Sequence, residues 1–304
     1  MKTSDVRPVL VTGGTGGQGG SVVKKCIERG IAVRALVRDP GSASAQALEA
    51  AGADVVRGDF SDEASLDEAM IGVRGVFSMQ QDGAPPSQFE NLIGSAVSQG
   101  VEQYIHSTVS GVREREADAL EDEYDIKHNY WRAKIAQERA LRAATFRYRT
   151  YLRPSLIIDN FSLRASFLYP RLAKSGDLLV AMPPETRVSF VSYDTVGRVA
   201  AEAFADPERF DQAEIELADA FVSYRDIANI LEEASGKTVT LTSVNADEAI
   251  AMGLPARVVD SHTWLANVGY PARPEMLARY NIDPLPIRDW VSREVAHIVI
   301  GNTR

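Results

Sequence analysis

The feature of this sequence that most constrains its fold is a run of glycines near the N-terminus, between a strand-like and a helix-like segment. The apolar run 9–12 is followed by Gly-Gly-Thr-Gly-Gly-Gln-Gly-Gly at positions 13–20. Gly13 can adopt a tight turn, Gly16 lets a phosphate approach the backbone N–H groups at a helix start, and Gly19 allows close packing of helix on strand. In this context the spacing predicts a dinucleotide-binding turn. The residues expected to bind the pyrophosphate are Gly13, Thr15, Gly16, Gly17, Gln18 and Gly19.

The first half of the chain alternates short β-branched runs with amphipathic runs, which is typical of βαβ units around a parallel sheet. We expect strands at 8–12, 32–37, 53–57, 75–79 and 101–107, and helices at 17–29, 44–51, 62–71 and 86–99. A longer helix at 124–144 and a sixth strand at 148–158, interrupted at Pro154, should follow. The predicted fold class is α/β, a doubly wound parallel sheet of the Rossmann type.

The alternation of strand-like and helix-like runs becomes less regular in the second half of the chain. Candidate elements are strands at 188–191 and 213–217, helices at 193–205 and 287–298, and a helix that begins at Ser223 with Asp226 in capping-box spacing. We expect residues 1–158 to form the NADP-binding domain, with segments around 187–220 returning to it. Residues 159–304 should form a smaller substrate-binding α/β lobe over the carboxyl ends of the strands, where open α/β sheets bind ligands.

Charge and composition argue against several classes of function. The formal net charge is −9 and no cluster of Lys and Arg stands out, so we expect no direct nucleic-acid partner. Apolar runs are strand-sized and the N-terminus has no signal or transit pattern, which predicts a cytoplasmic protein without membrane contact. The single cysteine, Cys26, has helical spacing to apolar neighbours and is expected to be a buried core thiol. The acidic stretch 114–125 is expected to be a solvated loop.

The end of the second predicted strand favours NADP over NAD. NAD sites usually place an acidic residue there to bind the ribose 2′-hydroxyl, whereas this sequence has Arg38. Its guanidinium can bind a 2′-phosphate through two hydrogen bonds. Asp39 keeps NAD as an alternative, and Arg38 could also be a solvated strand end. After the third strand, Asp59 and Phe60 could frame the adenine, although Asp59 could equally cap the following helix.

Several motifs together resemble the NmrA-like group of atypical short-chain dehydrogenases/reductases over nearly the whole chain. The matching segments are 12–19, 33–39, 58–60, 100–105, 152–154, 160–161, 194–198 and 289–290. The resemblance implies an NADP-binding Rossmann fold with a small C-terminal lobe. It leaves two kinds of activity open, because the group includes both reductases and nucleotide-sensing regulators that perform no chemistry.

Tyr130 and Lys134 carry the argument for catalysis, because they have the Tyr-x-x-x-Lys spacing of short-chain dehydrogenases. A spacing of four puts both side chains on one helix face. A neighbouring ammonium stabilises the phenolate and lowers the tyrosine pKa, so the phenol can pass a proton as hydride moves. Lys134 can also hold the nicotinamide ribose. The alternative is that Tyr130 only packs the helix against its neighbours.

A hydroxyl beyond the fifth strand would complete such a site by binding the substrate carbonyl. Ser107, Thr108 and Ser110 lie at or just beyond the end of this strand. Thr108 and Ser110 are the candidates, and Ser110 is slightly favoured. The alternative is that these hydroxyls only cap backbone groups at the strand end. The four histidines show no metal-ligand spacing with carboxylates or the cysteine, so no metal is expected.

Residues after the sixth strand are the remaining candidates. The resemblance implies that Pro154 contacts the nicotinamide and that Asn160 and Phe161 contact the substrate. Trp264 could close an apolar substrate pocket, although Phe161 and Trp264 have spacings that are also typical of core residues.

These observations predict an NADPH-dependent oxidoreductase that reduces an apolar carbonyl, quinone or activated alkene, with Tyr130 as proton donor and Lys134 as its activator. The competing hypothesis is a regulatory protein that senses NADP(H) without catalysis. The expected partner is a small-molecule substrate, and the chain is expected to be a monomer or a homodimer.

Overall fold

A computed structural model describes residues 6–116 and 127–301 of the chain. The chain divides into two compact units. The first comprises Met1–Pro154 and Tyr193–Ile215, and the second comprises Ser155–Ser192 and Glu216–Arg304. Among the described residues, no helix is long and apolar enough to cross a membrane.

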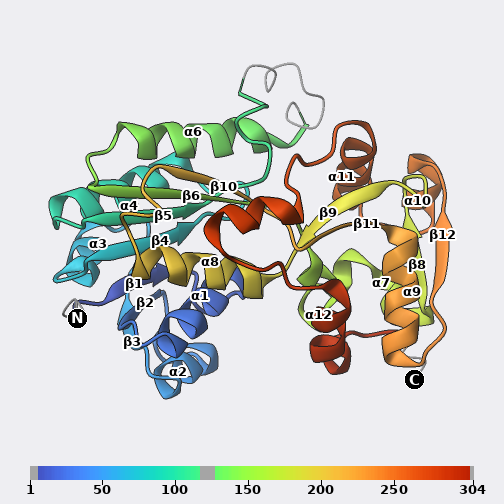
Figure 1. Ribbon diagram of the computed structural model, residues 1–304, viewed down its shortest axis with the longest axis horizontal. Coiled ribbons are helices and arrows are strands. Elements are labelled where there is room, and N and C mark those ends of the chain that lie inside the picture. The colour runs from blue at the N-terminus through green and yellow to red at the C-terminus, as the bar shows by residue number, and fades with distance from the viewer. Residues whose placement is uncertain (1–5, 117–126, 302–304) are drawn as a thin grey trace. The chain divides into compact units, whose positions relative to one another are not determined.

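The first unit is built on a seven-stranded sheet with the order β10-β6-β5-β4-β1-β2-β3 (Figure 1). Every pair from β3 across to β6 is parallel. The strands are β1 Val9–Thr12, β2 Val33–Val37, β3 Asp54–Arg57, β4 Gly75–Met79, β5 Gln103–Ser107, β6 Tyr148–Pro154 and β10 Ala213–Leu217. The order reverses at β1, so the carboxyl ends of β1 and β4 lie at a topological switch point, where open sheets bind ligands.

Helices cover both faces of this sheet, with α4 and α6 on one face and α1 and α8 on the other (Figure 1). The helices of the unit are α1 Gly17–Glu28, α2 Ala43–Ala50, α3 Glu63–Met70, α4 Pro86–Ser98, α6 Tyr130–Ala143 and α8 Tyr193–Ala205. Because both faces are covered, the central strands are buried, and every residue of β1 and β5 is buried. Cys26 lies on the buried face of α1, which confirms the predicted core thiol.

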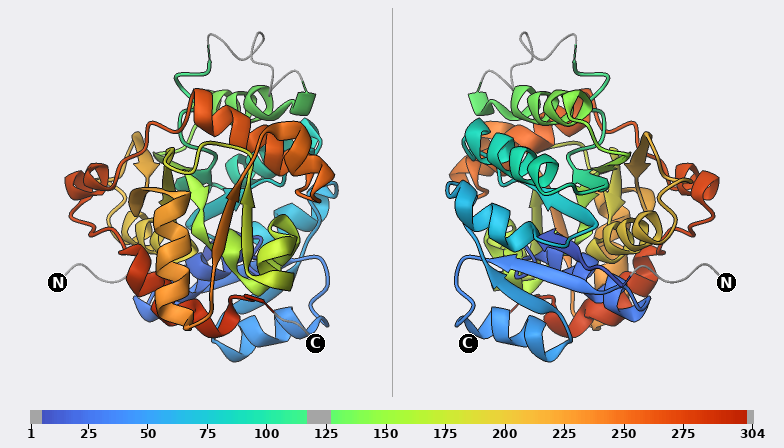
Figure 2. Two further views of the ribbon diagram at one scale, coloured as in Figure 1. Left: turned by 90° about the vertical axis from the view of Figure 1, so that its right-hand side faces the viewer. Right: turned by 90° about the vertical axis from the view of Figure 1, so that its left-hand side faces the viewer.

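The second unit contains two small sheets. In one, β9 (Arg187–Val191) lies between β11 (Ala220–Ser223) and β7 (Leu156–Ile157); the other pairs β8 (Asp177–Val180) with β12 (Thr240–Ser243). The orange α9 (Tyr224–Ser235) runs beside the β8–β12 sheet in the left-hand view of Figure 2. The other helices are α7 Pro170–Ser175, α10 Ala246–Ala251, α11 Ala256–Asn267 and α12 Ile287–Glu294, with 3-10 turns at Ile158–Phe161, Leu163–Leu168, Pro274–Tyr280 and Val295–His297.

Most predicted elements of the first unit are confirmed to within two residues, and the predicted capping box of Ser223 and Asp226 is present at α9. The strand expected at 148–158 is interrupted at Pro154 as predicted, with β6 before the interruption and β7 after it. Two helix predictions differ from the structure. The last helix ends at Glu294 before a 3-10 turn. The helix expected from 124 is observed from Tyr130, and its predicted first residues, like most of the acidic stretch, lie outside the described residues.

Candidate nucleotide-binding site

A pocket of about 450 Å³ lies in the first unit at the carboxyl ends of β1, β2, β3 and β4. It brings together eight of the residues predicted from the sequence: Gly13, Thr15, Gly16, Gly17, Gln18, Arg38, Asp59 and Phe60. The other lining residues are Leu36, Val37, Gly58, Met79, Gln80, Gln81, Ala84, Gln88 and Tyr193.

The glycine turn has the geometry that its sequence predicts. Gly13 has a φ of +65°, a conformation that favours glycine, and its carbonyl accepts a 2.9 Å hydrogen bond from Gly16 N–H. A Cβ on Gly19 would lie 2.3 Å from the Gly13 carbonyl oxygen, so helix and turn are in direct backbone contact. Gly16 caps α1 without a side-chain hydrogen bond, which leaves the first N–H groups of the helix available to an anion.

Tyr193 approaches the turn from a distant part of the sequence. A Cβ on Gly17 would lie 2.1 Å from the Tyr193 ring, so only glycine fits beneath it. Tyr193 begins α8, which packs on α1 and is joined to it by a 2.7 Å ion pair between Lys25 and Asp194. Tyr193 was not predicted as a site residue, because nothing local to it indicates that α8 begins beside the glycine turn.

The tips of β2 and β3 form the side of the pocket suited to an adenosine. Arg38 is exposed there, and its side chain has no hydrogen bond or ion pair to any residue that the structure describes. Asp39 instead turns toward its own loop, where one carboxylate oxygen accepts from Gly41 N–H at 2.9 Å. Asp59 lines the pocket and also accepts from Ser61 N–H at 2.8 Å, whereas the cap of α3 is Asp62.

The segment after β4 forms the opposite side. Met79, Gln80 and Gln81 line the pocket directly after that strand. None of the three was predicted as a site residue, although ligands of open parallel sheets bind at the carboxyl ends of the strands, where these residues lie. Gln80 is only 3% exposed, and its carbonyl accepts from Lys134 Nζ at 3.1 Å.

Tyr130 and Lys134 lie in the first turns of α6, on the helix face that the spacing predicts. Lys134 is 5% exposed; its Nζ is 5.7 Å from the centre of the Tyr130 ring and 3.6 Å from a carboxylate oxygen of Asp82. Tyr130 is half-buried and packs edge-on against Trp131. Lys134 is thus joined to the pocket through Gln80, and Tyr130 lies beside Lys134.

The hydroxyls at the end of β5 differ in their surroundings. Ser107 donates to Gln18 Oε1 of the glycine turn at 2.8 Å, and Thr108 donates to the buried carboxylate of Glu138 at 2.8 Å. Ser110 is fully buried, and its N–H donates to the Pro154 carbonyl at 2.9 Å. A role of Thr108 or Ser110 in substrate binding stays a prediction.

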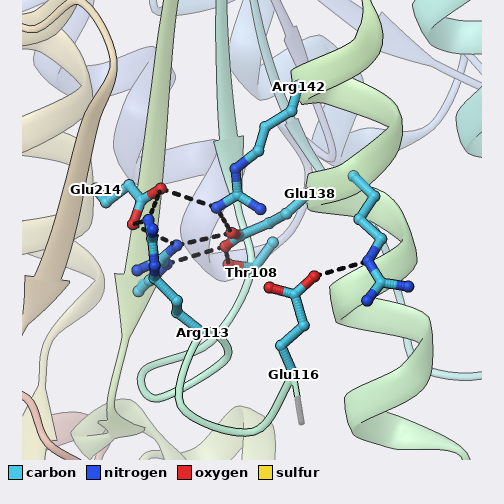
Figure 3. A network of polar contacts seen from close by, with 8 residues as sticks. Thr108, Arg113, Glu116, Glu138, Arg142 and Glu214 are labelled. Atoms are coloured by element: carbon cyan, nitrogen blue, oxygen red, sulfur yellow. Dashed lines mark hydrogen bonds and ion pairs between the residues drawn. The ribbon is translucent and has the colours of Figure 1, made fainter.

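Glu138 is the centre of a buried ionic network on α6 (Figure 3). Both of its oxygens accept from Arg153, at 3.0 and 2.7 Å, and Arg142 donates to it at 2.8 Å. Glu214 contacts Arg142 and Arg113, each at 2.8 Å. Burial opposes ionisation of Glu214, yet hydrogen bonds from these arginines hold its pKa below the usual value.

The residues predicted to contact substrate, Asn160, Phe161 and Trp264, lie in the second unit, whereas Pro154, predicted to contact the nicotinamide, ends β6 in the first unit. Phe161 is 4% exposed and stacks on Tyr169 with ring centres 4.8 Å apart. Trp264 is 8% exposed and contacts Tyr270 at 5.1 Å, while Asn160 is half-buried. Their contact with substrate stays a prediction. Among residues 6–116 and 127–301, no cluster of His, Cys, Asp and Glu is arranged to hold a metal ion.

Comparisons with known proteins agree with this architecture. The sequence model described as the NmrA-like family matches residues 6–266. An NAD(P)H azoreductase of Xenophilus azovorans is 25% identical over 260 residues, which cover 83% of this chain and 84% of the relative.

Two solved structures show that the fold is shared. An NADPH-dependent quinone oxidoreductase of Escherichia coli, complexed with NADPH, superposes with a TM-score of 0.75 at 22% identity, covering 94% of this chain and 99% of that one. NmrA, a negative transcriptional regulator, superposes with a TM-score of 0.71 at 16% identity, covering 95% of both chains.

Proposed function

This chain belongs to the NmrA-like family, and we propose that it is an NADPH-dependent oxidoreductase that reduces an apolar carbonyl, quinone or activated alkene. The observation that carries the proposal is the pocket on the glycine turn, with the exposed guanidinium of Arg38 at one end and Lys134 behind the other. The azoreductase and the quinone oxidoreductase to which the chain is similar support this class of reaction.

NADP(H) fits the charge of the pocket better than NAD(H). Arg38 offers a cation to a 2′-phosphate, and Asp39, the residue that would favour an unphosphorylated ribose, is hydrogen-bonded to its own loop. The N–H groups at the start of α1 would bind the pyrophosphate. Bound NADPH would supply the hydride.

Tyr130 is the proposed proton donor and Lys134 its activator. The Lys134 ammonium lies 5.7 Å from the Tyr130 ring, close enough to stabilise a phenolate by its charge. Lys134 is itself held in place by the Gln80 carbonyl and the Asp82 carboxylate. As the substrate takes hydride, the Tyr130 hydroxyl would donate a proton to the atom that becomes negative.

An assay of NADPH oxidation against a panel of quinones, azo dyes and aromatic ketones tests this proposal. Tyr130→Phe should lower kcat by about 100-fold or more, because it removes the proton donor, while nucleotide affinity stays nearly unchanged. Tyr148→Phe, a half-buried tyrosine on β6 outside the pocket, is the matched control and should keep full activity.

Two results would contradict this function. Full activity of Tyr130→Phe would place the proton donor elsewhere. Absence of turnover with every acceptor, together with tight nucleotide binding that depends on oxidation state, would favour a non-catalytic regulator of NmrA type.

A further inference from the structure

Gln80 lines the pocket, and one hydrogen-bond donor of its side-chain amide has no partner among the described residues. The residue is 3% exposed, and the donor atom is Nε2. A buried amide without a partner costs free energy comparable to a lost hydrogen bond, so such groups usually have a partner in the functional state. The donor therefore marks a position where a ligand acceptor fits.

A chain of hydrogen bonds behind Gln80 shows which end of its amide is already bonded. Gln137 Nε2 donates to Gln80 Oε1 at 3.2 Å, so Gln137 Oε1 is left to accept from His106 Nε2 at 3.3 Å. His106 Nδ1 lies 2.8 Å from Ser78 Oγ and 3.2 Å from the Ser78 carbonyl oxygen. Burial, reinforced by the charge of Lys134, lowers the pKa of His106 to about 3, so the ring is neutral and has one N–H to donate. The Gln80 oxygen is occupied in this arrangement and the Nε2 hydrogens remain.

The strand order indicates which half of a bound dinucleotide Gln80 would contact. Arg38 and Asp59 follow β2 and β3, on one side of β1, whereas Gln80 follows β4 on the other side. A dinucleotide with its pyrophosphate on the turn after β1 and its adenosine 2′-phosphate at Arg38 places its other nucleoside toward β4. Lys134 Nζ lies on the same side, bound to the Gln80 carbonyl.

We propose that the Gln80 side-chain amide donates a hydrogen bond to an oxygen of the nicotinamide ribonucleoside, and that Gln137 positions it. This inference rests on the proposed NADP(H) site and adds to it a residue that recognises the nicotinamide half. Gln80 would thus complement Arg38, which recognises the adenosine half.

Calorimetry with three ligands tests the assignment without any turnover. NADP⁺ contains both halves, and 2′-phospho-ADP-ribose lacks only the nicotinamide. In 2′,5′-ADP the whole nicotinamide mononucleotide is missing, including its phosphate. Gln80→Met keeps the length of the side chain but removes the donor, and should weaken NADP⁺ about tenfold while leaving 2′,5′-ADP unchanged. An equal loss for 2′-phospho-ADP-ribose would identify a ribose oxygen as the acceptor, and no loss would identify the nicotinamide carboxamide.

Gln103→Met is the matched control. Gln103 is a 1% exposed glutamine at the amino end of β5 in the same sheet, with its Nε2 bonded to the Ala203 carbonyl at 2.6 Å. The control should lose thermal stability but keep all three affinities. Gln80→Glu, which keeps the shape of the side chain without its N–H donors, should repeat the pattern of Gln80→Met and serves if that variant folds poorly.

The outcomes separate this inference from the function on which it rests. If wild-type protein binds NADP⁺ and neither Gln80 variant changes its affinity, or all three ligands weaken equally, the inference is overturned and the nucleotide site stands. If wild-type protein binds none of the three ligands, both are overturned.

Discussion

At the scale of single residues, cofactor choice is decided by two neighbouring side chains at the tip of β2. Arg38 and Asp39 are both charged, and either could meet the ribose in a Rossmann site. The structure separates them, because Asp39 accepts from Gly41 N–H while Arg38 stays exposed at the pocket. We therefore expect the preference for NADP(H) over NAD(H) to depend on Arg38.

Arg38→Ala should weaken NADP⁺ by more than about tenfold and change NAD⁺ little, because a charge-assisted bond to phosphate contributes more than about 1.5 kcal/mol. Calorimetry with both nucleotides measures the difference. Arg57→Ala, an exposed arginine at the end of the adjacent β3, is the control and should change neither affinity. Equal losses of NADP⁺ and NAD⁺ in Arg38→Ala would refute the assignment.

A second prediction at this scale concerns the contact between helix and turn. Gly19→Ala should weaken NADP⁺ by more than about tenfold, because its Cβ would lie 2.3 Å from the Gly13 carbonyl oxygen and must displace the turn. Gly94→Ala in α4, where a Cβ would meet nothing within 4 Å, should keep the affinity and stabilise the fold by up to about 1 kcal/mol. Wild-type affinity in Gly19→Ala would show that the turn tolerates displacement.

At the scale of elements, α6 joins the proposed chemistry to the framework of the first unit. Tyr130, Lys134, Glu138 and Arg142 recur every four residues and share one helix face. The first two lie at the pocket side, and the last two are bound by arginine and glutamate side chains of the sheet and its connections (Figure 3). The ionic network thus holds in place the helix that carries Tyr130 and Lys134.

Glu138→Ala should destabilise the protein by about 3–5 kcal/mol, because it leaves the 3% exposed guanidinium of Arg153 without its main partner. Glu116→Ala removes an exposed ion pair to Arg139 on the same helix and should cost less than about 1 kcal/mol. Urea denaturation measures both free energies of unfolding. Similar small losses in the two variants would show that the buried network contributes little.

At the scale of the whole molecule, each unit buries one histidine in a neutral state. Burial and the charge of Lys134 lower the pKa of His106 in the first unit to about 3, and burial lowers the pKa of His262 in the second unit to about 3. His262 accepts from Ala181 N–H and contacts the Tyr224 hydroxyl within the second unit. Neither ring can be protonated without losing packing or hydrogen bonds.

Acid should therefore destabilise both units. Above about pH 6.5 these histidines are neutral in the folded and unfolded states, so they add no pH dependence. Below about pH 6.5 these histidines bind protons in the unfolded chain but not in the folded protein. The free energy of unfolding should therefore fall by about 1.4 kcal/mol per pH unit for each histidine, down to about pH 3. Denaturation at several pH values between 7.5 and 5 measures this slope, and His106→Gln or His262→Gln should reduce it. A flat profile in that range would contradict the prediction.

The parts of the fold that the sequence predicted best are those determined by local interactions. The strand–turn–helix at Gly13, the ends of α4 and α8 and the cap at Ser223 depend on neighbours a few residues away, and all appear where expected. The short strands β8, β11 and β12 were not predicted, because four-residue strands in a small mixed unit have no periodicity long enough to detect.

The sequence by itself determined the glycine turn, the parallel α/β framework and the cationic tip at Arg38, since each depends on residues adjacent in the chain. Only the tertiary structure decided which distant residues meet at that turn. It brought Tyr193 over Gly17 and joined Thr108 to Glu138. It also left Nε2 of Gln80, a pocket-lining residue, without a partner in the part of the chain that the structure describes. The physical reason is that burial and hydrogen-bond satisfaction depend on all the elements that surround a side chain, and these elements are distant in sequence.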